Sequence, residues 1–328
     1  MLKNKKLYLG GELIIIYEDI KNILETKEIN RSIYDFKEHL KKIENNKNIL
    51  IVGSGGSYVT GLYAKYIIEK NMKNLCEVLK PMEVMQTNLE LYSYAIMYSY
   101  KMKGYDMKKA INFILNNNNI KKVIIVTAKE TESKFIDEKI SYIYYDKKSE
   151  YEKKYVSYKG IYLPTFILGS CFENIDIDLE KLENIKIETN KTNKIDVFFD
   201  KDNNCFAQLI ERHFCELGIA TVRIHEKKDF SHGRMSILEK EGEVIFINSY
   251  NYDKKYETIL LNYLKNVYKS KILNKSELEL NMQLNYFEKM LLALYWINEC
   301  SIKYGISLED KKDTKDDEKL FKYGEENL

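Results

Sequence analysis

The sequence predicts an α/β protein built from two tandem, doubly wound parallel-sheet domains. Short, apolar, β-branched runs alternate with segments of helical periodicity, which is the pattern of βαβ units. The run Asn48–Val52 ends in glycines that open a helix. The same strand–helix order returns from Lys194 onward, so the two halves of the chain are expected to be built alike.

In the first half, helical segments place apolar residues three and four positions apart, as Leu62 and Tyr66 show. Strands are expected at Asn48–Val52, Leu75–Leu79, Tyr94–Tyr98, Lys122–Thr127 and Ser141–Tyr145. Helices are expected at Glu18–Leu24, Ile33–Ile43, Tyr58–Lys70 and Met107–Leu115.

The second half follows the same rules after a junction across Tyr151–Asn174. Strands are expected at Lys194–Phe199, Thr221–Ile224 and Val244–Asn248, with a weaker one at Lys271–Asn274. Helices are expected at Asn204–Leu217, Tyr256–Tyr268 and Tyr286–Tyr304.

Composition excludes several classes of protein. The 52 basic and 50 acidic residues nearly balance, which gives no field suited to nucleic acid. No run approaches the roughly 18–20 apolar residues that a membrane span needs. The five cysteines are scattered and form no Cys-x-x-Cys, which favours reduced thiols in the cytoplasm and argues against a zinc site.

The turn Gly53–Tyr58 is a candidate anion site. A strand that ends in glycines and opens a helix presents backbone N–H groups and a partial positive charge to an anion. The third glycine of the dinucleotide pattern and the lysine of the nucleotide-triphosphate pattern are both missing. Ser54, Gly55 and Ser57 therefore form the expected binding turn, and a tight connection without a ligand is the alternative.

Glu216 and His232 are candidate acid/base residues, sixteen positions apart. Glu216 falls in the last turn of its predicted helix, before Gly218, where a carboxylate opposes the helix macrodipole. An acid in such a field suits a general base that works near neutral pH. Gly233 permits close approach of a ligand, and Arg234 could hold a carboxylate or phosphate. Taken singly, each candidate could also be an ordinary surface acid or loop histidine.

Together these motifs resemble the sugar isomerase (SIS) domain proteins, of the two-domain type seen in the isomerase half of glucosamine-6-phosphate synthase and in related phosphosugar isomerases and deglycases. Gly53–Tyr58 is similar to the family's first phosphate-side turn, and Leu79–Glu83 to the segment after its second strand. Glu216 falls at the spacing of the family's proton-transferring glutamate, and Phe230–Gly233 at that of its ring-opening histidine.

Two further segments extend the resemblance. Tyr155–Gly160, which contains Ser157, is similar to the stretch that opens the family's long helix between the halves. Leu320–Lys322 is similar to the C-terminal tail whose lysine enters the sugar site, which makes Lys322 a candidate catalytic residue. The resemblance implies an N-terminal extension over residues 1–45, SIS-like domains over 46–174 and 175–310, and a tail over 311–328 that closes the site.

One segment departs from the family. Where a hydroxyl-rich loop usually wraps the phosphate, this chain has Ser99–Asp106, with two lysines, a glycine and bulky tyrosines. Ser99, Lys101 and Lys103 are the candidate ligands in it, since lysines can bind phosphate as point charges. Equally, the tyrosines could fill the pocket, or the ligand could lack a phosphate.

The resemblance implies an aldose–ketose isomerase or a related deglycating enzyme for a sugar or amino-sugar phosphate. In it His232 opens the ring, Glu216 carries a proton between C1 and C2, and no metal or cofactor takes part. A cytoplasmic homodimer is expected. The alternative is a non-catalytic sugar-phosphate sensor, which the altered loop after the third strand favours.

Overall fold

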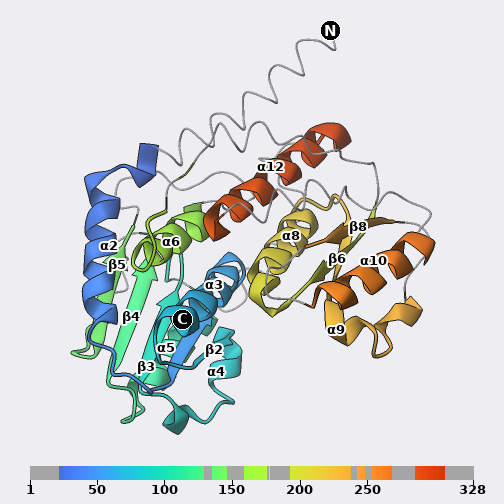
Figure 1. Cartoon of the computed structure of the whole chain (residues 1–328). Helices are drawn as coiled ribbons and strands as arrows, with labels where there is room; N and C mark the ends of the chain where they lie inside the picture. Colours follow the sequence, from blue (N-terminus) through green and yellow to red (C-terminus); the bar gives the residue numbers. More distant parts are fainter. Residues whose placement is uncertain are drawn as a thin grey trace. The chain divides into compact units, whose positions relative to one another are not determined.

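The computed structural model describes residues 22–102, 104–128, 135–145, 159–175, 177, 193–237, 242–247, 253–267 and 285–306. The chain divides into two compact units (Figure 1). The described residues up to 175 belong to one, here called the first unit, and those from 177 to 306 belong to the second unit.

The first unit is built on a five-stranded sheet in which every pair of neighbouring strands is parallel. Its strands lie in the order β2-β1-β3-β4-β5. They are β1 (Ile49–Gly53), β2 (Cys76–Leu79), β3 (Tyr94–Tyr98), β4 (Lys122–Thr127) and β5 (Ile140–Tyr144). The parallel sheet predicted for this half is therefore confirmed.

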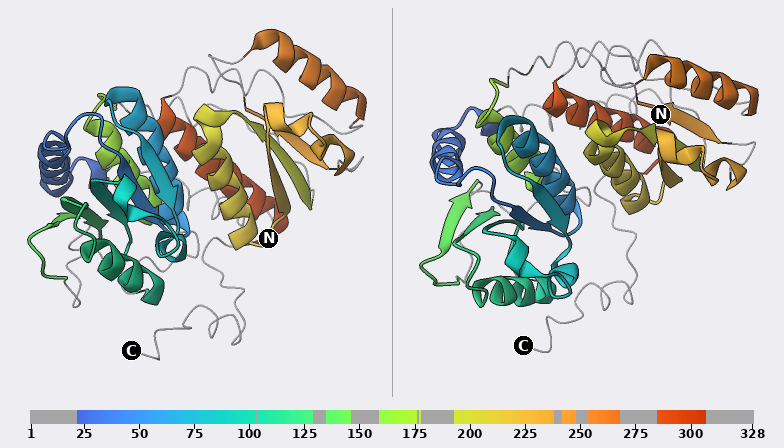
Figure 2. Two further views of the ribbon diagram at one scale, coloured as in Figure 1. Left: turned by 90° about the horizontal axis from the view of Figure 1, so that it is seen from below. Right: turned by 60° about the horizontal axis from the view of Figure 1, so that its bottom comes forward.

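Helices cover both faces of this sheet, as Figures 1 and 2 show. They are α2 (Lys27–Leu40), α3 (Gly56–Asn71), the single turn α4 (Pro81–Val84), α5 (Tyr105–Leu115) and α6 (Lys159–Ser170), and a 3₁₀ turn η1 covers Leu89–Leu91. Alternate strand residues such as Leu50 and Met97 pack against α5, whereas Ile51 contacts α3 at Gly61. Because both faces are buried, the strands read as continuous apolar runs.

Helix α2 begins six residues before the predicted helix start at Ile33. Thr26 caps it, since its hydroxyl accepts the N–H of Ile29. Ile29 and Phe36 are fully buried, seven positions apart on one side of the helix. Tertiary burial of this face therefore extends the helix through a polar stretch that local periodicity had assigned to a loop.

The second unit holds a three-stranded parallel sheet in the order β7-β6-β8, again with helices on both sides (Figure 2). Its strands are β6 (Lys194–Phe199), β7 (Thr221–Glu226) and β8 (Glu243–Phe246). Its helices are α8 (Asn204–Glu216), the single turn α9 (Lys227–Phe230), α10 (Lys254–Val267) and α12 (Tyr286–Tyr304), and 3₁₀ turns η2 and η3 cover Lys201–Asn203 and Arg234–Ile237. The second predicted parallel sheet is thus confirmed over three strands.

Strand β7 continues two residues beyond its predicted end at Ile224, because His225 is buried in an aromatic cluster with Phe198 and Phe230. The weak strand expected at Lys271–Asn274 lies outside the described residues. All five cysteines are free thiols, as expected. Within the described ranges, no helix combines the length and the apolar character that a bilayer crossing would need.

Candidate functional site

The predicted anion turn lies at the point of the first sheet where ligands bind in this class of fold. In the order β2-β1-β3-β4-β5, β1 has β2 on one side and β3 on the other, so the carboxyl ends of β1 and β3 are the switch point at which open α/β sheets bind ligands. Gly53 pairs with Tyr98 in the register of these strands. Ser54 and Ser99 therefore follow neighbouring strand ends, and the structure brings the two predicted loops to one edge.

Backbone geometry shows why glycines occupy this turn. Gly55 caps α3 with φ of 59°, a left-handed conformation that glycine adopts without strain. A Cβ on Gly53 would meet the Ser57 carbonyl group, with the carbonyl carbon 2.6 Å away. The turn closes through N–H donation from Ser57 to Ser54 O and from Tyr58 to Gly55 O. The earlier N–H groups at the helix start remain available to an anion.

The loop after β3 folds tightly on itself. The Ser99 hydroxyl accepts the N–H of Met102, whose φ of 51° is unusual for a residue other than glycine. The Met102 side chain is buried in the core, and the Tyr100 carbonyl accepts the Thr127 hydroxyl. Lys101 is exposed beside them. The Ser99 hydroxyl, which was expected to bind a ligand, therefore already accepts a hydrogen bond from the protein backbone.

Lys80 is a residue at this edge that the sequence did not single out. It follows the last residue of β2, and its ammonium lies 5.6 Å from the ring centre of Tyr58 in the anion turn. The Glu83 carboxylate accepts the Lys80 N–H and so caps the start of the short helix α4. Burial raises the pKa of the Tyr58 hydroxyl, which the negative charge of Glu83 reinforces. Lys80 therefore places positive charge next to the candidate anion site.

Replacing Gly53 with alanine should damage both the turn and anion binding. The new Cβ would force the Ser57 backbone to move, and such overpacking costs about 1–3 kcal/mol of unfolding free energy. Thermal unfolding and calorimetric titration with inorganic phosphate measure the two effects. Ser54→Ala separates the two effects, because it removes one candidate ligand hydroxyl without moving the backbone, so it should keep the parent stability and lose only part of the phosphate affinity. Undiminished phosphate affinity in Gly53→Ala would place the anion elsewhere.

Glu216 is the last residue of α8, as predicted, and its side chain is partly exposed. Two neighbouring side chains contact this carboxylate in the unfavourable field of the helix end. The guanidinium of Arg212, one turn earlier, lies 2.5 Å from one carboxylate oxygen, and the buried His213 ring lies 3.5 Å from the other. Arg212 therefore offsets the macrodipole and holds the carboxylate in one orientation.

His232 lies on an exposed turn that directly follows α9. Its N–H donates to Asp229 O, and Gly233 after it has φ of 121°. Arg234 is tied back to the protein, since its guanidinium donates to Ile224 O at 3.0 Å and pairs with Asp229 at 3.4 Å. The imidazole is thus exposed to solvent, and the contacts of Arg234 with Ile224 and Asp229 hold the backbone that carries it.

Glu216 and His232 lie at opposite ends of β7. Only residues 217–220 join the last residue of α8 to the first residue of β7, which places the end of α8 beside the start of this strand. His232 follows the strand's last residue by one helical turn. The strand has six residues, so its first and last residues are five steps, or about 17 Å, apart at a rise of about 3.3 Å per step. Within a single chain, the structure therefore does not bring this carboxylate and this imidazole to the same reacting atoms.

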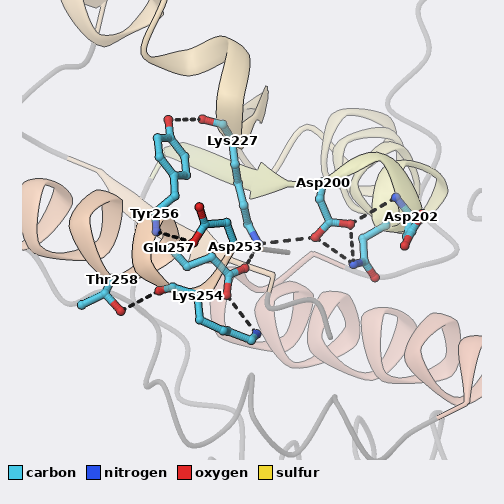
Figure 3. Close-up of polar contacts among 9 residues, drawn as sticks. Asp200, Asp202, Lys227, Asp253, Lys254, Tyr256, Glu257 and Thr258 are labelled. Atoms are coloured by element: carbon cyan, nitrogen blue, oxygen red, sulfur yellow. Dashed lines mark hydrogen bonds and ion pairs between the residues drawn. The ribbon is translucent and has the colours of Figure 1, made fainter. Parts of the chain in front are cut away.

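The second unit also contains two buried ionic clusters that the sequence did not reveal. In one, fully buried Asp196 accepts two bonds of 2.8 Å from Arg223 and one of 2.7 Å from His225. In the other, fully buried Lys227 pairs with Glu257 at 2.5 Å and with Asp200 at 3.4 Å (Figure 3). For the Asp196 cluster, the sequence offered one signal, an acidic residue between apolar strand residues. For the Lys227 cluster it offered none, because Lys227 and Lys228 resemble a run of solvent-exposed charges.

Three predicted site residues, Lys103, Ser157 and Lys322, lie outside the described residues. Within the described part of the chain, no three His, Cys, Asp or Glu side chains are grouped so that they could hold a metal ion.

No protein-family profile matches the sequence, and no curated protein does so either. Solved structures do match. Glucosamine-6-phosphate deaminase from Thermotoga maritima shares 16% identity over 90% of this chain and 98% of its own, with a TM-score of 0.63. Tagatose-6-phosphate ketose/aldose isomerase from Escherichia coli shares 13% over 82% and 86%, with a TM-score of 0.61.

The C-terminal domain of glucosamine-fructose-6-phosphate aminotransferase from Francisella tularensis shares 15% identity over 88% of this chain and 96% of its own, with a TM-score of 0.57. The three alignments extend over most of both chains in every case. This protein therefore has the two-sheet SIS fold of these sugar-phosphate proteins, as the resemblance of its motifs predicted.

Proposed function

We propose that the protein is an aldose–ketose isomerase, or a related amino-sugar or deglycating enzyme, that acts on a sugar phosphate. The observation that carries the proposal is the Ser54–Ser57 turn at the switch point of the first sheet. Each of the three structural neighbours is named after a phosphorylated six-carbon sugar. A helix start with free N–H groups suits that phosphate.

Each candidate residue has a role in this proposal. The turn binds the phosphate, and Lys80 and Lys101 add positive charge. His232 opens the ring by moving a proton from the anomeric hydroxyl to the ring oxygen. Glu216 takes the C2 proton and delivers it to C1 through an enediol, whose oxygens need hydrogen-bond donors rather than a metal or cofactor. The remaining candidate sugar ligands are Ser99, Lys103, Ser157, Arg234 and Lys322.

We also propose that the enzyme works as a cytoplasmic homodimer. Glu216 and His232 lie at opposite ends of β7, yet both are assigned to one reaction. In a dimer with a two-fold axis, each subunit can place its His232 near the Glu216 of the other subunit, so that both residues reach one substrate. The sharing of residues between subunits follows from the length of β7 and the assigned roles together.

Hydrogen exchange at C2 tests the isomerase proposal. The protein is incubated in deuterated water with a panel of aldose, ketose and amino-sugar phosphates, and NMR follows loss of the C2 proton. The proposal predicts exchange with at least one phosphorylated sugar and much less with its unphosphorylated form. Exchange that is equally fast without the phosphate would remove the assigned role of the Ser54–Ser57 turn.

A sugar-phosphate sensor is the second candidate, and the loop after β3 favours it. The Ser99 hydroxyl is used inside the loop, and Tyr100, Lys101 and Met102 follow it where the family's loop is rich in hydroxyls. A sensor would bind a sugar phosphate at the same turn without exchanging its C2 proton. Binding to the panel without any exchange would therefore replace the isomerase with the sensor.

A further inference from the structure

We propose that Lys227 is a positioning residue for His232, because its buried ammonium anchors the turn that carries the imidazole. The inference rests on the role of His232 in the proposed function. Lys227 is the first residue of α9 and follows the end of β7 directly. His232 comes five residues later, so the fixed end of the turn lies immediately before the exposed imidazole.

Both the side-chain ammonium and the backbone carbonyl of Lys227 are bound by other residues (Figure 3). Its ammonium pairs with Glu257 of α10 at 2.5 Å and with Asp200, after β6, at 3.4 Å. Its carbonyl accepts the hydroxyl of Tyr256 at 2.9 Å. Helix α10 and the end of β6 thus fix the start of α9 from two directions. A lysine with no exposed surface needs such partners, since an unpaired buried charge is strongly unfavourable.

A second anchor lies three residues further on. Phe230 is buried against Phe198, at a ring distance of 4.8 Å, and against His225 at 5.5 Å. Residues three apart share one side of a helical turn. Lys227 and Phe230 therefore attach that side to the sheet, which leaves Lys228 and Asp229 exposed. His232 lies on the exposed side of this turn, and the buried side, with Lys227 and Phe230, supports it.

Lys227 also occupies the switch point of the second sheet. In the order β7-β6-β8, β6 has β7 on one side and β8 on the other, as β1 has β2 and β3 in the first sheet. Asp200 directly follows β6, and the Lys227 ammonium lies 4.5 Å from the ring centre of Phe246 at the end of β8. An internal cation thus fills the position that in the first sheet is open to an anion.

The test replaces the anchor together with its shorter ionic partner, and the other partner, Asp200, keeps the hydrogen bonds that it accepts from Asp202 N–H and the Asn203 amide. Lys227→Met combined with Glu257→Gln removes the strongest pair and keeps the side-chain volumes similar. Tyr256→Phe is a milder second variant that removes only the hydroxyl bound to the Lys227 carbonyl. Lys254→Met is the matched control, because Lys254 pairs with the other oxygen of Glu257 but is largely exposed and does not belong to the turn.

Amide hydrogen exchange gives a readout that needs no substrate. In the double variant, residues 228–236 should exchange about tenfold faster than in the parent or in Lys254→Met, as local opening becomes easier. Tyr256→Phe should shift the same residues in the same direction by less. Unchanged exchange in this turn would overturn the proposal, whatever the protein does to sugars.

Kinetics then separates positioning from general damage. On ring-closed sugar phosphates, kcat should fall by about 10- to 100-fold in the double variant, whereas open-chain substrates should be spared. In a His232→Ala background the same two changes should have no further effect. Equal losses on both substrate forms, or a further loss without His232, would show a merely structural role. Faster exchange in the turn, with a parent that acts on no sugar, would uphold the anchor and reject the isomerase.

Discussion

Glu216→Gln should abolish turnover of the sugar phosphate while leaving its binding nearly unchanged. The amide keeps the shape of the side chain and its contact with Arg212, but it cannot accept the C2 proton. Loss of a general base lowers the rate by about 10²–10⁴-fold. Deuterium exchange at C2 and steady-state kinetics measure the effect. Glu211→Gln, on the same helix, is the matched control and should retain parent activity.

Complementation between two inactive variants tests the sharing of residues. In a dimer of Glu216→Gln with His232→Ala, one site loses both groups and the other keeps both. Co-expressed chains that mix at random should therefore recover about a quarter of parent activity on a ring-closed substrate. No recovery from a verified mixed dimer would mean that both residues serve one site from the same chain. Fast C2 exchange by Glu216→Gln itself would place the base elsewhere.

Asp196→Ala should destabilise the second unit by about 3–5 kcal/mol, because it leaves the buried His225 and the partly buried Arg223 without their acceptor. The carboxylate accepts both Arg223 bonds and the Nε2 contact of His225, and its side chain has 1% exposure. Urea unfolding followed by the fluorescence of Trp296 is the direct measurement. Trp296 is the only tryptophan of the chain, and it packs on Phe214 in the same unit.

Asp35→Ala is the control for a surface ion pair, and its urea unfolding is followed by circular dichroism because Asp35 belongs to the first unit. Asp35 also pairs with an arginine, Arg31, but at 3.7 Å and with both side chains exposed. Removal of such a surface pair should change the unfolding free energy by less than about 0.5 kcal/mol. A loss at Asp196 as small as the one at Asp35 would show that solvent, rather than the carboxylate, satisfies Arg223 and His225.

Local sequence patterns were sufficient to predict the two-sheet α/β architecture and the glycine turn that follows β1. Buried parallel strands such as Ile49–Gly53 and Lys122–Thr127 are short apolar runs, and this signal is local. The glycines of the turn are also a local signal, because φ at Gly55 and the crowding at Gly53 exclude other side chains whatever surrounds them. The helices between the strands predicted that the sheets are parallel, whereas the order of the strands came from the structure.

The burial of polar residues, and the separation of the candidate catalytic residues, could be learned only from the folded chain. Alternation along β6 would place Asp196 on a solvated face, yet Arg223 and His225 of β7 convert that face into a buried ionic cluster. Lys227 belongs to a run that reads as exposed charge, and Glu257, thirty residues later, makes its burial possible. The sixteen-residue spacing of Glu216 and His232 suggested a pair, but the strand between them holds them apart. Pairing across long sequence separations depends on packing in three dimensions, and local sequence patterns do not contain that information.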